Sequence, residues 1–192
     1  MAILTRLRWT LLLGTTLIAS TGEVSGQVDE YQVKAAFLYN FAKFVKWPER
    51  TFSTLHDPIT ICLIGDTVLR RVLEDTIAGK EIDGRRLVVK TISDMQQVNV
   101  CQILFVSGAE QPHVLAILAG CKTRSVLTVG ETESFAAQGG VINFRVEDGK
   151  VRFEINIGAA DEQRLQISSK LLSLARLVKT NVRTDVKTDK AR

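Results

Sequence analysis

Apolar residues recur along this chain with a regular spacing that changes from one segment to the next. Within residues 28–46, Val33, Phe37, Phe41 and Phe44 stand three to four positions apart. This spacing predicts an amphipathic helix whose aromatic side chains face the core. Three basic residues lie off that face and are expected to point away from it: Lys34, Lys43 and Lys46.

Two further segments, residues 58–65 and 100–107, are short and almost continuously apolar. Runs of that length predict strands that are covered on both faces. The intervening and following segments alternate between helix and strand patterns: a helix over 67–77, a turn at Asp83-Gly84, a strand over 86–91, a helix over 111–118, a strand over 125–129 and a short helix near 132–137. This rhythm predicts an α/β domain of three layers, with helices on both faces of a mixed, largely parallel sheet.

The last third of the chain changes pattern. Residues 141–147 and 150–156 alternate apolar with polar side chains and are joined by Asp148 and Gly149. They predict a C-terminal β-hairpin with one face toward solvent. A final amphipathic helix is expected over 161–178. It would present seven side chains to the core: Leu165, Ile167, Ser168, Leu171, Leu172, Ala175 and Leu177.

The N-terminal residues have the parts of a secretory signal. Arg6 and Arg8 precede an apolar run over residues 9–19, and small residues follow it. The run is shorter than the roughly 20 residues that a membrane-spanning helix needs, so cleavage is favoured over anchoring. We expect residues 1–26 to be a cleavable signal peptide, with an earlier cut after Ala19-Ser20-Thr21 and an uncut anchor as the alternatives.

The remaining chain divides into one α/β domain, residues 27–179, and a basic tail, residues 180–192. The tail has no aromatic residue and no helical pattern, and is expected to be disordered. The formal net charge of the full chain is only +4, and charges of both signs are scattered along it. So slight an excess argues against a nucleic-acid partner.

The sequence contains no catalytic or cofactor-binding pattern. Gly65 follows a predicted strand, where a phosphate-binding loop would lie, but it belongs to no glycine-rich motif. Ser107 lacks the Gly-x-Ser-x-Gly context of a nucleophile, and the two histidines, His56 and His113, have the setting of surface residues. Five carboxylates are expected on turns or on the solvated face of the hairpin: Glu131, Glu133, Glu147, Asp148 and Glu154. These observations favour a binding or regulatory module without a cofactor over an enzyme.

Three cysteines, Cys62, Cys101 and Cys121, would meet an oxidising environment after export. One disulfide and one free thiol are therefore expected, and on these grounds all three pairings are open. The absence of a Cys-x-x-Cys motif argues against a metal site.

Four blocks of residues resemble the YfiR family. Residues 31–48, YQVKAAFLYNFAKFVKWP, are similar to the opening signature of that family, and residues 139–144, 151–156 and 168–176 resemble its other strong blocks. The resemblance implies a non-enzymatic periplasmic repressor. Such a protein binds the periplasmic part of an inner-membrane diguanylate cyclase of the YfiN type and restrains it, which lowers cyclic di-GMP and biofilm formation.

The same resemblance implies further partners and a disulfide. An OmpA-like outer-membrane lipoprotein can sequester the type member, and members tend to form homodimers. Two cysteines match the pair of the family, so Cys62 is expected to pair with Cys101, which leaves Cys121 as a buried, inert thiol. The alternative is a periplasmic small-ligand sensor or binding module for another membrane receptor, such as a histidine kinase, because the strand ends of an α/β sheet can form a crevice.

Overall fold

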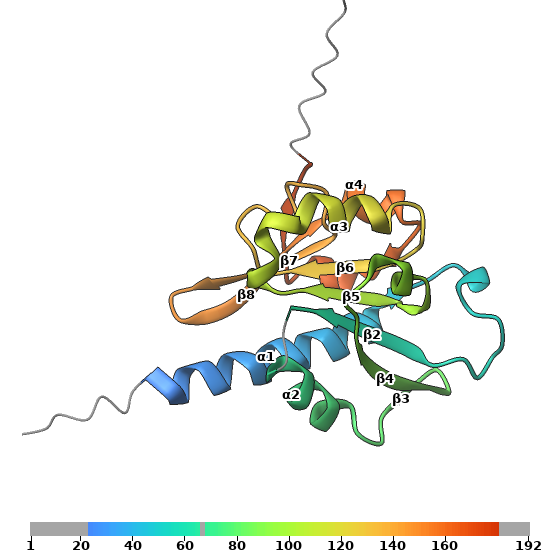
Figure 1. Cartoon of the computed structure of the whole chain (residues 1–192), viewed down its shortest axis with the longest axis horizontal. Coiled ribbons are helices and arrows are strands. Elements are labelled where there is room, and N and C mark those ends of the chain that lie inside the picture. Colours follow the sequence, from blue (N-terminus) through green and yellow to red (C-terminus); the bar gives the residue numbers. More distant parts are fainter. Residues whose placement is uncertain (1–22, 66–67, 181–192) are drawn as a thin grey trace, which may run out of the picture.

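The structure, a computed structural model, describes residues 23–65 and 68–180 (Figure 1). Most of the predicted signal peptide, residues 1–26, and most of the predicted tail, residues 180–192, therefore lie outside the described residues. The first helix begins at Glu23, and the expected mature start at Gln27 falls inside it.

Helices and strands alternate along the described chain, as the pattern predicts. The α-helices are α1 (Glu23–Phe44), α2 (Val68–Ile77), α3 (Val114–Cys121), α4 (Ile157–Glu162) and α5 (Ser169–Leu172). The 3-10 helices are η1 (Glu49–Thr51), η2 (Met95–Val100) and η3 (Gly108–His113). The strands are β1 (Val45–Lys46), β2 (Ile59–Ile64), β3 (Glu81–Ile82), β4 (Arg85–Thr91), β5 (Ile103–Val106), β6 (Leu127–Gly130), β7 (Ile142–Glu147), β8 (Lys150–Asn156), β9 (Gln166–Ile167) and β10 (Arg176–Val178).

The main sheet has eight strands in the order β10-β8-β7-β6-β5-β2-β4-β3. The central pairs β4-β2, β2-β5, β5-β6 and β6-β7 are parallel, while β7-β8 and β3-β4 are antiparallel. In Figure 1, α1 and α2 lie on one side of this sheet and α3 lies on the other. The observed fold is thus the predicted one, a mixed and largely parallel sheet with helices on both faces.

Alternation along the central strands divides the interior into two cores. In β2, Ile61 and Leu63 pack in the core beneath α1 and α2, whereas Cys62 between them belongs to the core beneath α3. In β5, Phe105 and Leu104 divide in the same way. Side chains of a strand point to opposite faces in turn, so a strand buried on both sides must be apolar throughout.

Aromatic side chains join α1 to the hairpin formed by β7 and β8. The ring centroid of Phe41 lies 5.7 Å from that of Phe144 and 5.2 Å from that of Phe153. Phe37 lies 5.1 Å from Phe153 in an edge-on arrangement. Such pairs add about 0.5–1.5 kcal/mol each to what their burial contributes. The aromatic positions of the first helix therefore form part of the core, as their spacing predicts.

Both Asp-Gly turns lie where the sequence places them. Asp83 and Gly84 have φ values of 51° and 75° between β3 and β4, and Asp148 and Gly149 have φ values of 51° and 68° between β7 and β8. Two successive positive φ angles are what a two-residue hairpin turn requires, and glycine adopts them without steric cost.

The prediction of one long helix over residues 161–178 is wrong. The segment is divided among the end of α4, strand β9, helix α5 and strand β10. Arg164 adopts φ +57° just beyond α4, which a continuing helix does not allow. Strand β9 pairs with β1, and β10 adds to the sheet beside β8, so their backbone groups bond to distant segments. Leu165 and Leu171 are buried as predicted, but Leu177 is exposed.

Three smaller predictions also need correction. Residues 132–139 form consecutive turns in place of a short helix, and Ser134 within them has φ +63°. Lys34 of α1, expected to point away from the core, is buried with only 6% of its surface exposed. Glu154, expected on the solvated face of the hairpin, is also buried, and it forms ion pairs with Arg145 and Arg176.

Asn156 connects the end of β8 to three other segments. Its Oδ1 accepts a hydrogen bond from the backbone N–H of Ala159 at 3.1 Å and so caps α4. Its Nδ2 donates to the backbone oxygen of Ala136 and to the hydroxyl of Thr180, both at 2.7 Å. The side chain is almost wholly buried, with 1% of the residue exposed.

We predict that Asn156→Ala lowers the free energy of unfolding by about 2–3 kcal/mol, because it removes a helix cap and the hydrogen bonds of the buried amide to the Ala136 carbonyl and the Thr180 hydroxyl. Denaturant unfolding followed by circular dichroism measures this change. The control is Asn99→Ala, since Asn99 is exposed and both of its hydrogen bonds, to the Gln96 backbone oxygen and from Arg124, lie at the surface, and its effect should stay within about 0.5 kcal/mol. Equal effects of the two substitutions would contradict this role of Asn156.

Candidate functional site

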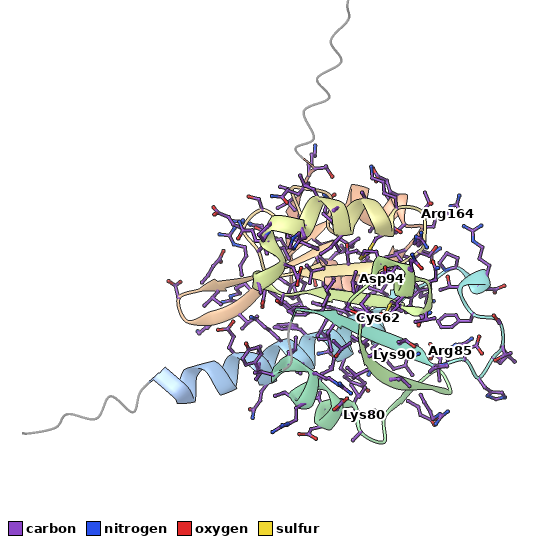
Figure 2. All side chains as sticks on the ribbon, viewed as in Figure 1. Cys62, Lys80, Arg85, Lys90, Asp94 and Arg164 are labelled. Carbon is purple, nitrogen blue, oxygen red and sulfur yellow. A yellow bond between two sulfur atoms is a disulfide. The ribbon has the colours of Figure 1, made fainter. Side chains whose placement is uncertain are left out.

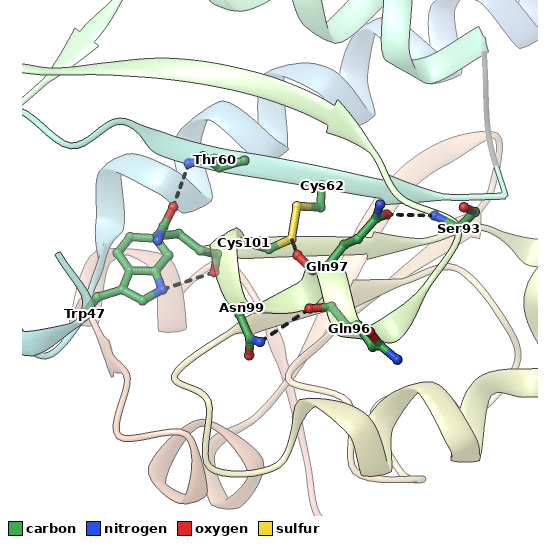
Figure 3. The surroundings of a disulfide bond; sticks show 9 residues. Trp47, Thr60, Cys62, Ser93, Gln96, Gln97, Asn99 and Cys101 are labelled. Atoms are coloured by element: carbon green, nitrogen blue, oxygen red, sulfur yellow. Dashed lines mark hydrogen bonds between the residues drawn. A yellow bond between two sulfur atoms is a disulfide. The ribbon is translucent and has the colours of Figure 1, made fainter. Parts of the chain in front are cut away.

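A disulfide links Cys62 in the central strand β2 to Cys101, which lies between η2 and β5 (Figure 3). The two Cα atoms are 5.7 Å apart, and the cysteines are separated by 39 positions in the sequence. This is the pairing that the family resemblance implies. The bond closes a loop that contains α2, β3 and β4, and a loop of this length gives roughly 4 kcal/mol of stabilisation in the chain-entropy model.

Hydrogen bonds hold the residues next to the disulfide in place. The side-chain Oε1 of Gln102 accepts from the backbone N–H of Thr60 at 2.7 Å, and its backbone oxygen accepts from the indole Nε1 of Trp47 at 3.1 Å. Trp47 directly follows β1, so this bond connects the segment after α1 and β1 to the residue that precedes β5. Figure 3 shows these bonds beside the two sulfur atoms.

The third cysteine, Cys121, ends α3 and lies in the same core as the disulfide. It is a free thiol with 1% of its surface exposed. Burial raises the pKa of the Cys121 thiol to about 12, because the thiolate would lose its hydration. A protonated, covered thiol is a poor nucleophile. The prediction of a buried, inert Cys121 agrees with this environment.

Lys34 connects α1 to the loop that follows β6. Its Nζ lies 2.5 Å from Oε1 of Glu30, one turn earlier in α1, and 2.5 Å from Oε2 of Glu131. The other carboxylate oxygen of Glu131 accepts from the backbone N–H of Gly108 at 2.9 Å. Glu131 therefore joins three segments, α1, the start of η3 and the end of β6, and is not a solvated turn residue as expected.

The charge of Lys34 is stabilised by its two partners. Burial alone lowers the pKa of Lys34, but the hydrogen bonds and negative charges of Glu131 and Glu30 outweigh it, so the pKa lies above the ordinary 10.5. Lys34 is therefore an ammonium ion at neutral pH. Its electrostatic contribution to stability is complete below about pH 10.5 and is lost as the pH rises through the higher folded-state value.

A cleft of about 530 Å³ opens beside this ion pair, at the carboxyl ends of β5 and β6. Its walls include Lys34 and Glu131 and two buried residues, Thr132 and Asn143. Within the described residues, neither the Thr132 hydroxyl nor the Asn143 Oδ1 has a hydrogen-bond partner. Crevices at the carboxyl ends of parallel strands are the usual ligand sites of open α/β sheets. The crevice expected from the fold class is present.

A second surface feature is the loop over residues 47–57. Both carboxylate oxygens of Asp57 accept bonds within the loop, from the Thr54 hydroxyl at 2.6 Å and from the backbone N–H groups of Ser53 and Thr54 at 2.6 and 3.0 Å. The Thr54 hydroxyl, and then the backbone N–H groups of Thr54 and Ser53, hold the pKa of Asp57 below its usual value.

Arg85 fastens this loop to β4 (Figure 2). Its Nη1 donates to the backbone oxygens of Thr54 and Asp57 at 2.9 and 2.8 Å, and its guanidinium lies 3.8 Å from the centroid of the Phe52 ring. The loop is therefore held by the bonds of Asp57 within it and by the bonds of Arg85 from β4. Leu55 on this loop nevertheless has 81% of its surface exposed. A large apolar side chain on a supported loop is a candidate contact for another protein.

The remaining candidate catalytic residues are not assembled into a site. The Ser107 hydroxyl caps η3 by accepting from the backbone N–H of Ala109 at 3.2 Å, and it donates to the Gly65 oxygen at 3.0 Å. His113 is exposed, and its Nδ1 lies 3.1 Å from Oε2 of Glu110 on the same turn. His56 is exposed on the 47–57 loop. None of these contacts joins the serine to a histidine.

Two further properties apply to the described part of the chain. There, no group of three or more His, Cys, Asp or Glu side chains could hold a metal ion. Across the same residues, no helix has the length and apolar character needed to cross a membrane.

We predict that reduction of the disulfide lowers the free energy of unfolding by roughly 4 kcal/mol, because the unfolded chain regains the entropy of an open loop. Denaturant unfolding with and without a phosphine reductant measures the difference, and the reductant should have no effect on the Cys62→Ala/Cys101→Ala variant. Thiol titration of the oxidised protein should give no reactive thiol when folded and one when unfolded. An equal effect of the reductant on the double variant would refute the pairing of Cys62 with Cys101. A thiol that reacts in the folded protein would refute the burial of Cys121.

We predict that Lys34→Met lowers the free energy of unfolding by about 2–3 kcal/mol, somewhat less than for a fully buried pair, because Glu131 retains some contact with solvent. In Lys34→Met/Glu131→Gln the unpaired carboxylate is gone, so the double variant should be more stable than the sum of the single effects by about 1–2 kcal/mol. Simple additivity across this double-mutant cycle would mean that the ion pair contributes nothing. The cost of Lys34→Met should also shrink as the pH rises above about 10.5, because Lys34 of the unfolded chain then loses its proton before the folded protein does, and the advantage is gone once the folded ammonium titrates.

Comparisons with known proteins agree with this fold. Two solved structures share it, a conserved domain protein from Vibrio cholerae O1 biovar El Tor (TM-score 0.52, 12% identity) and an ABC domain in complex with L-Trp from Streptococcus pneumonia (TM-score 0.50, 8% identity). Each comparison covers 78% of this chain but only 60% of the other chain. At these identities the likeness concerns the fold alone.

Sequence comparison is more informative than structure comparison for this chain. No curated protein matches it. A family model described as YfiR/HmsC-like, DUF4154, matches residues 31–176, which include both cysteines of the disulfide, the Lys34–Glu131 pair and the supported loop. Members of this family are generally non-catalytic, periplasmic regulators of diguanylate cyclases. The match spans most of the chain, so this protein belongs to the YfiR/HmsC-like family.

Proposed function

We propose that this chain is a non-enzymatic periplasmic regulator that binds the periplasmic part of an inner-membrane diguanylate cyclase and restrains it, thereby lowering cyclic di-GMP. The observation that carries this proposal is the family match over residues 31–176. Residues 1–26 would direct export and be removed, leaving a domain over residues 27–179. The disulfide suits an oxidising compartment such as the periplasm.

The chemistry of the chain supports a role in binding. Ser107 and Glu131 already make structural hydrogen bonds, and His113 pairs locally with Glu110. In contrast, the surface carries exposed apolar side chains that a protein partner could cover. Leu55, on the supported 47–57 loop, is the most exposed of them, and Val33 on α1 is 41% exposed. These two elements are the ones that we propose for contact with the receptor.

Further associations belong to the same proposal. An OmpA-like outer-membrane lipoprotein would sequester the regulator, and the chain would form a homodimer, as family members tend to do. Release of the cyclase would follow when the regulator is sequestered or loses its fold. The disulfide links such release to redox conditions, because its reduction removes roughly 4 kcal/mol of the folding free energy.

The second candidate function is a small-ligand sensor for another membrane receptor, such as a histidine kinase. The observation that favours it is the cleft of about 530 Å³ at the carboxyl ends of β5 and β6, which is within the usual size range of small-molecule sites. A regulator that binds a ligand in this cleft would combine both functions.

We predict that deletion of the gene raises cyclic di-GMP in the host cell and that expression of the full chain from a plasmid restores the original level. Leu55→Asp should restore it poorly, because a charge on the loop opposes an apolar contact. The matched control is Leu115→Asp, since Leu115 is also exposed, at 67%, but lies on α3 away from that loop. Mass spectrometry of nucleotide extracts measures the level. An unchanged level in the deletion strain would contradict restraint of a cyclase, and equal restoration by both variants would exclude the loop.

A further inference from the structure

The hairpin formed by β7 and β8 extends beyond the rest of the main sheet (Figure 1). Strand β6 ends at Gly130 and pairs with β7 only at Ile142 and Asn143. Strand β7 continues to Glu147. On this side of β7, no strand of the described chain pairs with it beyond Asn143. The sheet therefore has a vacant strand position, which lies in line with β6 and beside the second half of β7.

The register of the hairpin decides which backbone groups face the vacant position. The backbone N–H of Asn156 donates to the backbone oxygen of Val141 at 2.8 Å, so Val141 bonds toward β8. Bonded and non-bonded pairs alternate along an antiparallel ladder. Val146 lies an odd number of positions after Val141, so its N–H and its carbonyl point away from β8 and toward the vacant position.

This open edge of β7 borders the cleft of about 530 Å³, which Arg145 and Val146 help to line. Gly108 and Glu131 also line it. Gly108 follows β5, and β5 lies on the far side of β6 from β7, so the cleft has a wall across from the open edge. Lys34 of α1, paired with Glu131, lines it as well. A position with walls at both of its edges favours one extended chain over a second hairpin.

The open edge is apolar on the face toward α1. The ring centroid of Phe144 lies 5.7 Å from that of Phe41 in α1. Val146, two residues later, points to the same face and has 56% of its surface exposed. Residues opposite each other on paired strands have Cβ atoms about 4.5–5.5 Å apart. A strand beside β7 would therefore cover Val146 with every second side chain, and those side chains should be apolar.

We propose that this cleft receives an extended segment of the protein partner, with apolar residues at alternate positions, which adds to β7 as a strand in line with β6. The backbone of the segment bonds to the N–H and the carbonyl of Val146, and its apolar side chains pack on Val146 beside α1. In strand addition the main-chain bonds give affinity and the alternate side chains give specificity. The inference rests on the proposed function, since it names the part of the partner that enters the regulator.

The test uses overlapping synthetic peptides that tile the periplasmic segment of an inner-membrane diguanylate cyclase from the same genome. Each peptide is titrated into isotopically labelled mature protein, and amide hydrogen exchange is followed by NMR. We expect one peptide to bind saturably and to slow exchange of the Val146 amide about tenfold or more, because the added strand takes up its N–H. Exchange of the Val151 amide should not change, because that N–H points to the other edge of the hairpin.

Val146→Pro and Val151→Pro form a matched pair of variants. Each removes an N–H that points away from the hairpin ladder, and an edge strand tolerates proline at such a position. Val146→Pro should weaken binding of the peptide about tenfold, and Val151→Pro should bind it as the wild type does. Where Val146→Pro does not fold, N-methylation of the peptide gives the same information, because it should weaken binding at every second residue.

Equal exchange at Val146 with and without the bound peptide, or equal binding by Val146→Pro and the wild type, would overturn strand addition. Slow exchange at Val146 that depends on protein concentration, without any peptide, would assign the open edge to a second copy of the chain and also overturn it. Binding of the folded periplasmic segment without binding of any peptide would overturn this inference and leave the proposed function intact. If neither binds, the proposed function fails and this inference fails with it.

Discussion

The disulfide between Cys62 and Cys101 constrains the point on which the rest of the sheet depends. Strand β2 is central, with β4 on one side and β5 on the other, and the chain must cross over β2 to reach β5 after β4. The bond fastens that crossing to β2 itself. Around it lie two cores, one beneath α1 and α2 and one beneath α3, and the residues of β2 and β5 contribute to both in alternation. Loss of the bond therefore weakens both layers together.

The cleft lies at the opposite end of β5, and Gly108 after β5 and Glu131 after β6 line it. Glu131 connects the start of η3 to Lys34 of α1. The two proposed functions thus rest on different parts of one sheet. Partner binding is assigned to the supported 47–57 loop and α1, and ligand binding to the strand ends. Because α1 carries Lys34 on one face and Val33 next to it, a ligand in the cleft would lie one residue away from a proposed partner contact.

Much of this architecture could be predicted from the sequence, where local signals decide the structure. The Asp-Gly pairs at 83–84 and 148–149 define hairpin turns by their own conformational preference, and the apolar runs in β2 and β5 define buried strands. The failures involve distant partners. The sequence predicts that Lys34 faces solvent, because Glu131, the partner that makes its burial possible, is 97 positions away. The apolar spacing of residues 161–178 predicts a helix. The prediction fails because β9 and β10 form their backbone hydrogen bonds with β1 and β8, which are distant in the sequence. The cleft has no sequence motif, since its walls come from α1, the loops after β5 and β6, and β7, which meet only in the folded sheet.

The central claim is that the folded, disulfide-bonded domain binds the outer face of a diguanylate cyclase. The most direct measurement is calorimetric titration of oxidised mature protein with the purified periplasmic segment of an inner-membrane diguanylate cyclase from the same genome. Our account predicts saturable binding by the oxidised protein and weaker binding by the Cys62→Ala/Cys101→Ala variant at a temperature where that variant partly unfolds. An absence of binding by the oxidised protein to each such segment, while circular dichroism shows it to be folded, would contradict the account.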